Sequence, residues 1–188
     1  MSNRAVFLDR DGVLVRAELN GASVHGPLTL EAFELLPDLT GPVSRLRDAG
    51  YLVILATNQP GIARGYLSWD TVNEMHRRLR EVVVLDAIEV CPHTDADACE
   101  CRKPKPGMLT GAAERFSIAL SESYFVGDTE RDVRAAEAAG TTPVLIDAPY
   151  NQDLKVPNRV PDLAAAAELI LNARSRVRCV PASSGTSE

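Results

Sequence analysis

Five short runs of apolar residues recur along the chain, and each is followed by polar or small residues. They cover residues 5–8, 51–56, 87–90, 124–126 and 143–146. Within most of each run, neighbouring positions are apolar together instead of alternating with polar ones, which is typical of strands buried on both faces in a parallel sheet. The pattern therefore predicts five interior strands of one sheet.

Stretches with helical patterns lie between and after these runs, at residues 39–49, 68–83, 107–118, 130–139 and 161–173. Ser68 is a suitable N-cap for the second helix, and Gly50 and Gly140 follow the first and fourth, where glycine commonly ends a helix. Alternation of strands and helices predicts an α/β fold: a Rossmann-like parallel sheet with helices on both faces and right-handed crossovers. We expect residues 1–174 to form a single domain and residues 175–188 to form a flexible tail.

Length and composition exclude several classes of protein. The chain has 188 residues, of which 45% are hydrophobic, so one globular domain with a substantial core is expected. The formal net charge of −6 argues against general binding of nucleic acid, which requires a positively charged surface. No apolar run approaches the roughly 18 residues that a membrane span needs. Residues 1–4 lead into the first strand without a signal-like segment, so the cytoplasm is the expected compartment.

Residues capable of chemistry gather where the predicted strands end. Asp9 and Asp11 follow the first strand, Thr57 and Asn58 follow the second, and Asp128 follows the fourth. Parallel strands end at one edge of the sheet, and α/β proteins bind ligands at that edge. These side chains are therefore expected to line one site.

The first motif is Asp9-Arg10-Asp11-Gly12. Side chains two positions apart on an extended chain point to the same side, so Asp9 and Asp11 would share one opening. Two carboxylates this close repel each other unless a proton or a cation intervenes, and Mg²⁺ prefers such oxygen ligands. Considered alone, the segment is explained equally well by a solvent-exposed Asp-Gly turn.

Two loops offer groups that could hold phosphate. Thr57, Asn58 and Gln59 place a hydroxyl, amides and turn N–H groups after a strand, although an ordinary loop also explains them. Arg102 and Lys103, in a basic segment before a helix, offer a bidentate anion contact and a point charge. A solvated charged surface is the simpler explanation of that segment alone.

A fourth motif, Gly127-Asp128, ends another strand and precedes a helix. Asp128 adds a third carboxylate to the expected site. Asp132 lies one turn into the helix, where an exposed capping residue is the favoured interpretation and orientation of its neighbours is the alternative.

Three cysteines and one histidine occur close together: Cys91, His93, Cys99 and Cys101. Three thiolates and an imidazole complete a tetrahedral set for Zn²⁺ and leave no position for water, so we expect a structural zinc site. Such a site would order the loop and position the basic segment that follows it. The alternative is a set of buried cysteines with a coincidental histidine. The fourth cysteine, Cys179, lies in the tail and is expected to take no part.

Taken in this order, the four motifs resemble those of the haloacid dehalogenase-like phosphohydrolases over most of the chain. The resemblance implies that Asp9 is a nucleophile that forms an aspartyl-phosphate and that Asp11 is the general acid and base. It also implies that Asp9, the main-chain carbonyl of Asp11, and Asp128 bind Mg²⁺. Thr57 and Lys103 would stabilise the phosphoryl group during its transfer.

The cysteine-rich segment narrows the resemblance. Thr-Asn-Gln-Pro-Gly-Ile-Ala-Arg-Gly at residues 57–65, and Cys-Pro-His followed by Cys-x-Cys-Arg-Lys-Pro at residues 91–104, resemble the D-glycero-D-manno-heptose 1,7-bisphosphate 7-phosphatases. That resemblance implies a cap-less cytoplasmic enzyme that hydrolyses the C7 phosphate of a sugar bisphosphate. Asn58, Gln59 and Arg102 would contact the phosphorylated sugar. No large insertion separates the motifs, so a monomer is expected.

Three alternatives remain open. Five residues separate His93 from Cys99, and this short gap occurs in histidinol-phosphate phosphatases. Residues 16–22 and Thr129 depart from the pattern of the heptose enzymes, so another small sugar phosphate is the second alternative. A zinc-stabilised binding module without catalysis is the third, although the intact carboxylates and lysine of the motifs argue against it.

Overall fold

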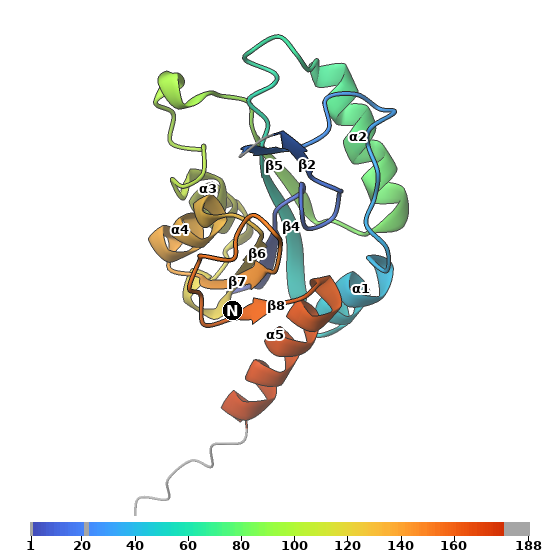
Figure 1. The fold of residues 1–188 in the computed structure, drawn as a ribbon. Coiled ribbons are helices and arrows are strands. Elements are labelled where there is room, and N and C mark those ends of the chain that lie inside the picture. The colour runs from blue at the N-terminus through green and yellow to red at the C-terminus, as the bar shows by residue number, and fades with distance from the viewer. Residues whose placement is uncertain (1, 21–22, 179–188) are drawn as a thin grey trace, which may run out of the picture.

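A computed structural model describes residues 2–20 and 23–178 of the chain. Its centre is a sheet of six strands in the order β5-β4-β1-β6-β7-β8, and all neighbouring pairs in it are parallel (Figure 1). The strands are β1 (Arg4–Leu8), β4 (Tyr51–Asn58), β5 (Ala87–Cys91), β6 (Tyr124–Gly127), β7 (Thr142–Ile146) and β8 (Arg159–Val160). Counted along the chain, these six strands have the 3-2-1-4-5-6 order of a Rossmann-like sheet, which confirms the predicted fold class.

All five apolar runs form strands of this sheet, and each strand has one bound as predicted and the other one or two residues away. Three further strands escape the sequence pattern. β8 has two residues, and β2 (Glu18–Asn20) and β3 (Ser23–His25) form an antiparallel hairpin with three residues each. Segments this short contain too few positions to show a periodic pattern.

The described part of the chain has five α-helices: α1 (Thr40–Asp48), α2 (Trp69–Val82), α3 (Gly107–Phe116), α4 (Glu130–Ala139) and α5 (Leu163–Arg178). The predicted caps are confirmed, since the Ser68 hydroxyl accepts a hydrogen bond from a main-chain amide at 3.0 Å and Gly50 and Gly140 have positive φ angles of 83° and 77°. α5 continues past residue 173, so residues 175–178 of the expected tail are helical. The rest of that tail, residues 179–188 with Cys179, lies outside the described residues. None of the described helices is long and apolar enough to cross a membrane.

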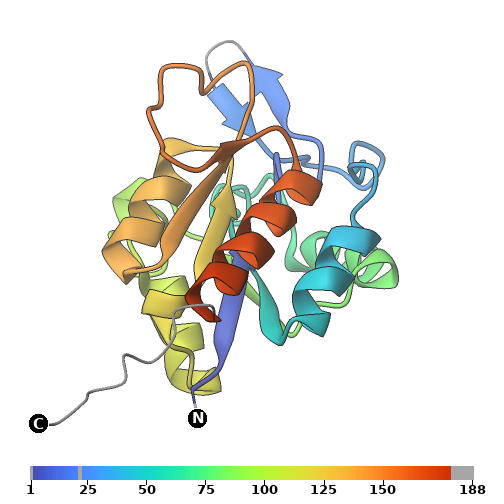
Figure 2. The ribbon, with the colours of Figure 1, turned by 90° about the horizontal axis from the view of Figure 1, so that it is seen from below.

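The helices form a layer on each face of the sheet (Figure 2). Side chains of α1, α2 and α5 pack with one set of strand residues in one hydrophobic core, and those of α3 and α4 pack with the alternate set in a second core. In β1, Val6 and Leu8 belong to the first core, whereas Ala5 and Phe7 belong to the second. Burial on both faces explains why the strands appear as nearly continuous apolar runs.

The order of the strands determines where a site can form. β1 lies between β4 and β6, so the chain connections diverge to opposite sides there and leave a crevice at the carboxyl ends of the strands. Asp9 follows β1 and Asp128 follows β6, so both reach this crevice. Between β1 and β4, the described residues add the β2–β3 hairpin and α1 but no second domain, in agreement with the cap-less fold that the resemblance implies.

Candidate active site

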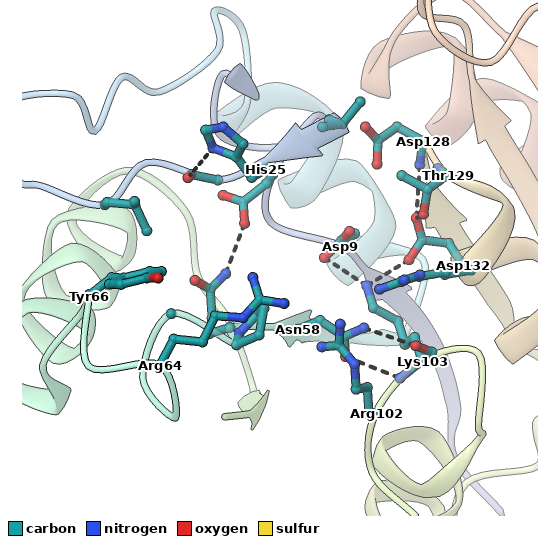
Figure 3. Close-up of a pocket in the computed structure, with 18 residues that line it drawn as sticks. Asp9, His25, Asn58, Arg64, Tyr66, Arg102, Lys103, Asp128, Thr129 and Asp132 are labelled. Carbon is teal, nitrogen blue, oxygen red and sulfur yellow. Dashed lines mark hydrogen bonds and ion pairs between the residues drawn. The ribbon is translucent and has the colours of Figure 1, made fainter. Parts of the chain in front are cut away.

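A pocket of about 300 Å³ opens at the carboxyl edge of the sheet (Figure 3). Seven of the predicted residues line it: Asp9, Asp11, Asn58, Gln59, Arg102, Lys103 and Asp128. Thr57 is fully buried, and its Oγ1 accepts a hydrogen bond from the Gln59 side chain at 2.9 Å. The structure therefore brings the residues of all four motifs to one place.

Lys103 lies in this pocket between two carboxylates (Figure 3). Its Nζ is 2.8 Å from Asp9 Oδ1 and 2.6 Å from Asp132 Oδ1, and both Lys103 and Asp132 have side chains that are only 2% exposed. Attraction between opposite charges is stronger where water is excluded. An ammonium held beside Asp9 can stabilise negative charge that develops on a reacting group there.

Burial and neighbouring charges change the pKa values of Asp9 and Lys103. It raises the pKa of Asp9 to about 7, with Asp132 and Asp11 adding to the rise and Lys103 opposing it. Burial by itself lowers the pKa of Lys103, but the carboxylates of Asp132 and Asp9 outweigh it and raise that pKa above its ordinary value. Lys103 is therefore charged at neutral pH, whereas full ionisation of Asp9 calls for a further positive charge.

The donor set at Asp9 fits a magnesium ion. Oxygens of Asp9, Asp128 and Asp132 lie within 4.8 Å of one another. Asp128 is fully buried, and its Oδ1 has no hydrogen-bond partner among residues 2–20 and 23–178. Burial, followed by the charges of Asp132 and Asp9, raises the pKa of Asp128 well above its ordinary value. Three carboxylates beside one ammonium leave an excess of negative charge that a hard divalent cation neutralises.

Asp11 takes a different position from the other carboxylates. The Arg10 guanidinium donates to Asp11 Oδ1 at 2.9 Å and to Oδ2 at 3.1 Å, and Gln59 Nε2 donates to Oδ2 at 2.8 Å. Gly26, after the hairpin, lies against the same group, since a Cβ there would be 2.2 Å from Asp11 Oδ2. The Asp11 side chain is thus held at the pocket wall. Its acid and base roles, and magnesium binding by its main-chain carbonyl, stay predictions.

The Cys/His loop, residues 91–101, leaves β5 at the same edge of the sheet. The possible ligand atoms of Cys91, His93, Cys99 and Cys101 lie within 4.8 Å of one another, and the three cysteines are free thiols. A short 3-10 turn, η1 (Asp95–Asp97), with a reciprocal cap between Thr94 and Asp97, shapes the polar part of the loop. The predicted grouping is confirmed, and it offers the four nitrogen and sulfur donors that a tetrahedral metal site requires.

Two predicted substrate contacts also hold the protein together. Asn58 Nδ2 donates to the Lys103 main-chain carbonyl at 3.0 Å, and Asn58 Oδ1 accepts from the Lys103 amide at 3.1 Å, so Asn58 fixes the position of the lysine. The Arg102 side chain donates to Asp95 Oδ1 at 2.8 Å and to the His93 carbonyl at 3.0 Å. The Cys/His loop thereby holds an arginine of the pocket wall.

Asp132 corrects one expectation. Its capping role is confirmed, because Asp132 Oδ2 accepts hydrogen bonds from the amide and the hydroxyl of Thr129 at 3.0 and 2.6 Å. The expected exposure is wrong, because Asp132 is buried and its other oxygen contacts Lys103. The reason is close packing against the end of β6: a Cβ on Gly127 would lie 2.3 Å from Asp132 Cβ. The first turn of α4 therefore faces the pocket.

Three other residues near the site are not among the predicted site residues. Arg131 lines the pocket from the first turn of α4, and its position after a strand-end aspartate was a signal that could have identified it. His25 lines the pocket from the β2–β3 hairpin, and the Tyr150 hydroxyl donates a hydrogen bond to Asp128 Oδ2. Both lie in segments without periodic pattern, so only the folded chain reveals them.

Known proteins provide an independent comparison. A family profile described as HAD-hydrolase-like matches residues 100–166. The D-glycero-beta-D-manno-heptose-1,7-bisphosphate 7-phosphatase of Pseudomonas putida is 43% identical over 148 residues, covering 76% of this chain and 82% of that protein. The protein of the same name from Bordetella bronchiseptica is 36% identical over 180 residues, covering 89% of this chain and 98% of that protein.

The similarity extends to a solved structure. The crystal structure of D,D-heptose 1,7-bisphosphate phosphatase from B. bronchiseptica, complexed with magnesium and phosphate, is similar to this chain with a TM-score of 0.78 at 36% identity. The match covers 90% of this chain and 99% of that one. A related protein with this fold therefore binds the ion that the carboxylates of the pocket fit.

Proposed function

The chain belongs to the D-glycero-D-manno-heptose-1,7-bisphosphate 7-phosphatase family of HAD-like hydrolases, and we propose that it hydrolyses the C7 phosphate of its heptose bisphosphate through an aspartyl-phosphate on Asp9. The observation that carries the proposal is the buried contact of 2.8 Å between Lys103 Nζ and Asp9 Oδ1. A lysine that stays charged beside the nucleophile stabilises the oxygens of a phosphoryl group as it moves onto Asp9.

In the proposed reaction, a carboxylate oxygen of Asp9 attacks phosphorus, and the bond between phosphorus and the sugar oxygen breaks. Asp11 turns from its partners at the pocket wall, gives a proton to the departing oxygen, and then takes one from the water that hydrolyses the aspartyl-phosphate. Thr57 and Lys103 stabilise the phosphoryl group. Magnesium, held by Asp9, Asp128 and the main-chain carbonyl of Asp11, would supply positive charge to the phosphate oxygens.

Zinc is the metal that we propose for the Cys/His loop. Three sulfurs and one imidazole nitrogen within 4.8 Å suit tetrahedral Zn²⁺, and four protein ligands leave no position for water or substrate. Its role is then structural. Because the loop holds Arg102 through Asp95 and the His93 carbonyl, ordering the loop also orders one wall of the pocket.

The charge at the pocket favours a substrate with two phosphates. Arg64, Arg102 and Arg131 line the pocket in addition to Lys103. A second phosphate would find complementary charge among these guanidinium groups. Histidinol phosphate has one phosphate and a positively charged amine, so it offers these arginines no second anionic group. The arginines therefore support the heptose bisphosphate over histidinol phosphate.

Phosphate release measured with malachite green separates the candidate substrates. The chain with saturating Mg²⁺ is given heptose 1,7-bisphosphate, fructose bisphosphate and histidinol phosphate in parallel. We expect kcat/KM for the heptose bisphosphate to exceed the others by about 10-fold or more. A preference for histidinol phosphate would replace the proposed substrate, and the absence of phosphate release from all three would favour a binding module.

The setting of the enzyme follows from the family resemblance and from the fold. The resemblance supports a cytoplasmic enzyme that acts on a small phosphorylated sugar. Between β1 and β4 the described residues add the β2–β3 hairpin and α1 but no second domain, which supports a monomer with an open pocket. Size-exclusion chromatography with light scattering measures the mass of the particle in solution and tests the monomer directly.

A further inference from the structure

Asp128 is contacted by a segment outside the four motifs. The connection from β7 to β8, residues 147–158, leaves the sheet at the same edge as the pocket. Two successive side chains in it return to Asp128. The Tyr150 hydroxyl donates a hydrogen bond to Asp128 Oδ2, and Asn151 Nδ2 donates to the Asp128 main-chain carbonyl at 2.8 Å. Both the side chain and the main chain of Asp128 are therefore held from this connection.

The first motif also lies close against the Asp128 carboxylate. Gly12 has a φ of +86°, and a Cβ at this position would lie 1.9 Å from Asp128 Oδ2 and 3.0 Å from the Tyr150 hydroxyl oxygen. Only glycine allows so close an approach of the backbone. Oδ2 is thus approached closely by both Gly12 and Tyr150, whereas Oδ1 is buried without a hydrogen-bond partner in the described ranges. A buried oxygen in this state costs free energy unless a donor or a cation satisfies it.

We propose that Tyr150 is a positioning residue for the magnesium site, where its hydroxyl holds Oδ2 of Asp128 and leaves Oδ1 available to the cation. The inference rests on the proposed function for the presence of magnesium beside Asp9 and Asp128. Tyr150 is not among the described residues that line the pocket, so it reaches the reaction through Asp128 and not by touching substrate.

The chemistry of the hydroxyl suits this task. A phenol is a neutral donor, so it fixes the direction of the carboxylate without cancelling its charge. Asp9 and Asp132 differ from Asp128, because each of them is paired with the ammonium of Lys103. Among the described residues, Asp128 has no ion pair with Lys103, so its carboxylate is left for the cation. Partners of metal ligands that act in this way typically change metal affinity by about 10- to 100-fold when they are removed.

The test is a magnesium titration of the full chain by isothermal titration calorimetry, without substrate. We expect Tyr150→Phe to raise the Kd for Mg²⁺ by about 10-fold. In activity assays, the Mg²⁺ concentration for half-maximal rate should rise in parallel, while kcat at saturating Mg²⁺ changes far less. Tyr124→Phe is the matched control, because Tyr124 lies at the other end of β6 from Asp128. We expect this variant to bind Mg²⁺ with the affinity of the wild type.

A second variant protects the test against poor folding. Tyr150→Ala leaves room for water to solvate Asp128 Oδ2, and it should also weaken Mg²⁺ binding because water does not fix the direction of the carboxylate. Wild-type Mg²⁺ affinity in either folded variant would overturn the inference, and so would a loss of kcat with unchanged Mg²⁺ affinity. Failure of the wild-type chain to bind Mg²⁺ would instead overturn the proposed function.

Discussion

The carboxylate cluster and the Cys/His loop both bring metal-binding groups together, but they do so by different means. The carboxylate cluster, Asp9, Asp128 and Asp132, draws its members from positions far apart in the chain, at the ends of β1 and β6 and in the first turn of α4. The Cys/His loop takes all its ligands from residues 91–101. The first cluster exists because the sheet forms, whereas the second takes its ligands from the end of β5 and the loop that follows it.

The two regions also differ in what holds them in place. All three carboxylates are buried, and those of Asp9 and Asp132 are paired with Lys103. Asp9 and Asp128 follow β1 and β6, which are neighbours at the centre of the sheet. In the Cys/His loop, the 3-10 turn has no buried residues, so this part of the loop has little apolar surface to hold it, although Cys91 is buried in the second core. We infer that folding creates the magnesium site, whereas metal binding stabilises the loop. Loss of a carboxylate should therefore affect activity, and loss of a thiol should affect stability.

The largest expected effect is on activity. Asp9→Asn removes the attacking carboxylate, and we expect kcat to fall by about 10⁴-fold or more, because removal of a catalytic nucleophile typically has effects of this size. Lys103 keeps its contact with Asp132, so the melting temperature should remain close to that of the wild type. Malachite green assays and differential scanning calorimetry measure the two quantities.

Glu137→Gln, exposed on α4, is the control for loss of a negative charge. Substantial turnover by Asp9→Asn would contradict the covalent route. A large loss of stability in Asp9→Asn would contradict the expectation that loss of a carboxylate affects activity and loss of a thiol affects stability.

The second prediction concerns the Cys/His loop. Cys101→Ser removes one of four ligands, and we expect zinc content, measured by mass spectrometry, to fall well below one per chain. Structural zinc sites in small peptides contribute about 10–16 kcal/mol. If the variant loses only roughly a third of that energy, about 4 to 5 kcal/mol, the melting temperature of a chain this size falls by about 10 °C or more.

Cys179→Ser is the matched control, because Cys91, His93, Cys99 and Cys101 already supply the four ligands of a tetrahedral site. Removal of Mg²⁺ alone should shift the melting temperature less than loss of zinc does. Equal shifts of the melting temperature after Mg²⁺ removal and after zinc loss would show that the two metal sites contribute equally to stability.

The same contrast explains what the sequence could predict. The Cys/His loop is recognisable from spacing alone, because its ligands are close in the chain. Asp9 and Asp128 are recognisable because apolar runs end at them, and strand order then brings them together. Tyr150 and His25 escape prediction, because they lie in an irregular connection and a short hairpin whose paths follow from packing. The burial of Asp132 depends on its packing against Gly127, which no pattern along the chain records.

A buried histidine outside both regions supplies the third prediction. His76 on α2 is 6% exposed, and burial, aided by the charge of Arg10, lowers its pKa from 6.5 to about 4. Between these values the unfolded chain binds the proton and the folded chain does not. The contribution of His76 to stability is therefore present above pH 6.5 and is lost as the pH falls toward 4.

Urea unfolding at pH 7 and pH 5 measures this effect. Between these values, the free energy of unfolding should fall by about 2 kcal/mol more in the wild type than in His76→Gln. Asn73→Gln, on the exposed face of α2, serves as the control and should keep the wild-type difference. If the free energy of unfolding falls by the same amount in His76→Gln as in the wild type, the loss of stability at pH 5 comes from other groups, which include those of the two metal-binding regions.

The smallest expected effect lies where the two regions meet. Arg131 lines the pocket, and its Nη2 is 3.6 Å from Asp95 Oδ2 in the Cys/His loop. The side chain is half exposed, so its contact with a second phosphate is worth only about 1 kcal/mol. We expect Arg131→Ala to raise KM for heptose 1,7-bisphosphate about fivefold, which corresponds to that energy, and to leave kcat nearly unchanged.

Two comparisons decide the meaning of that result. Arg134→Ala, on the same helix and paired with Glu130, removes an arginine outside the pocket lining and should leave KM unchanged. Heptose 7-phosphate lacks the second phosphate, so its KM should not respond to Arg131→Ala. An equal rise in KM for both substrates would show that Arg131 attracts anions in general, and the second phosphate would then have to bind through other cations of the pocket.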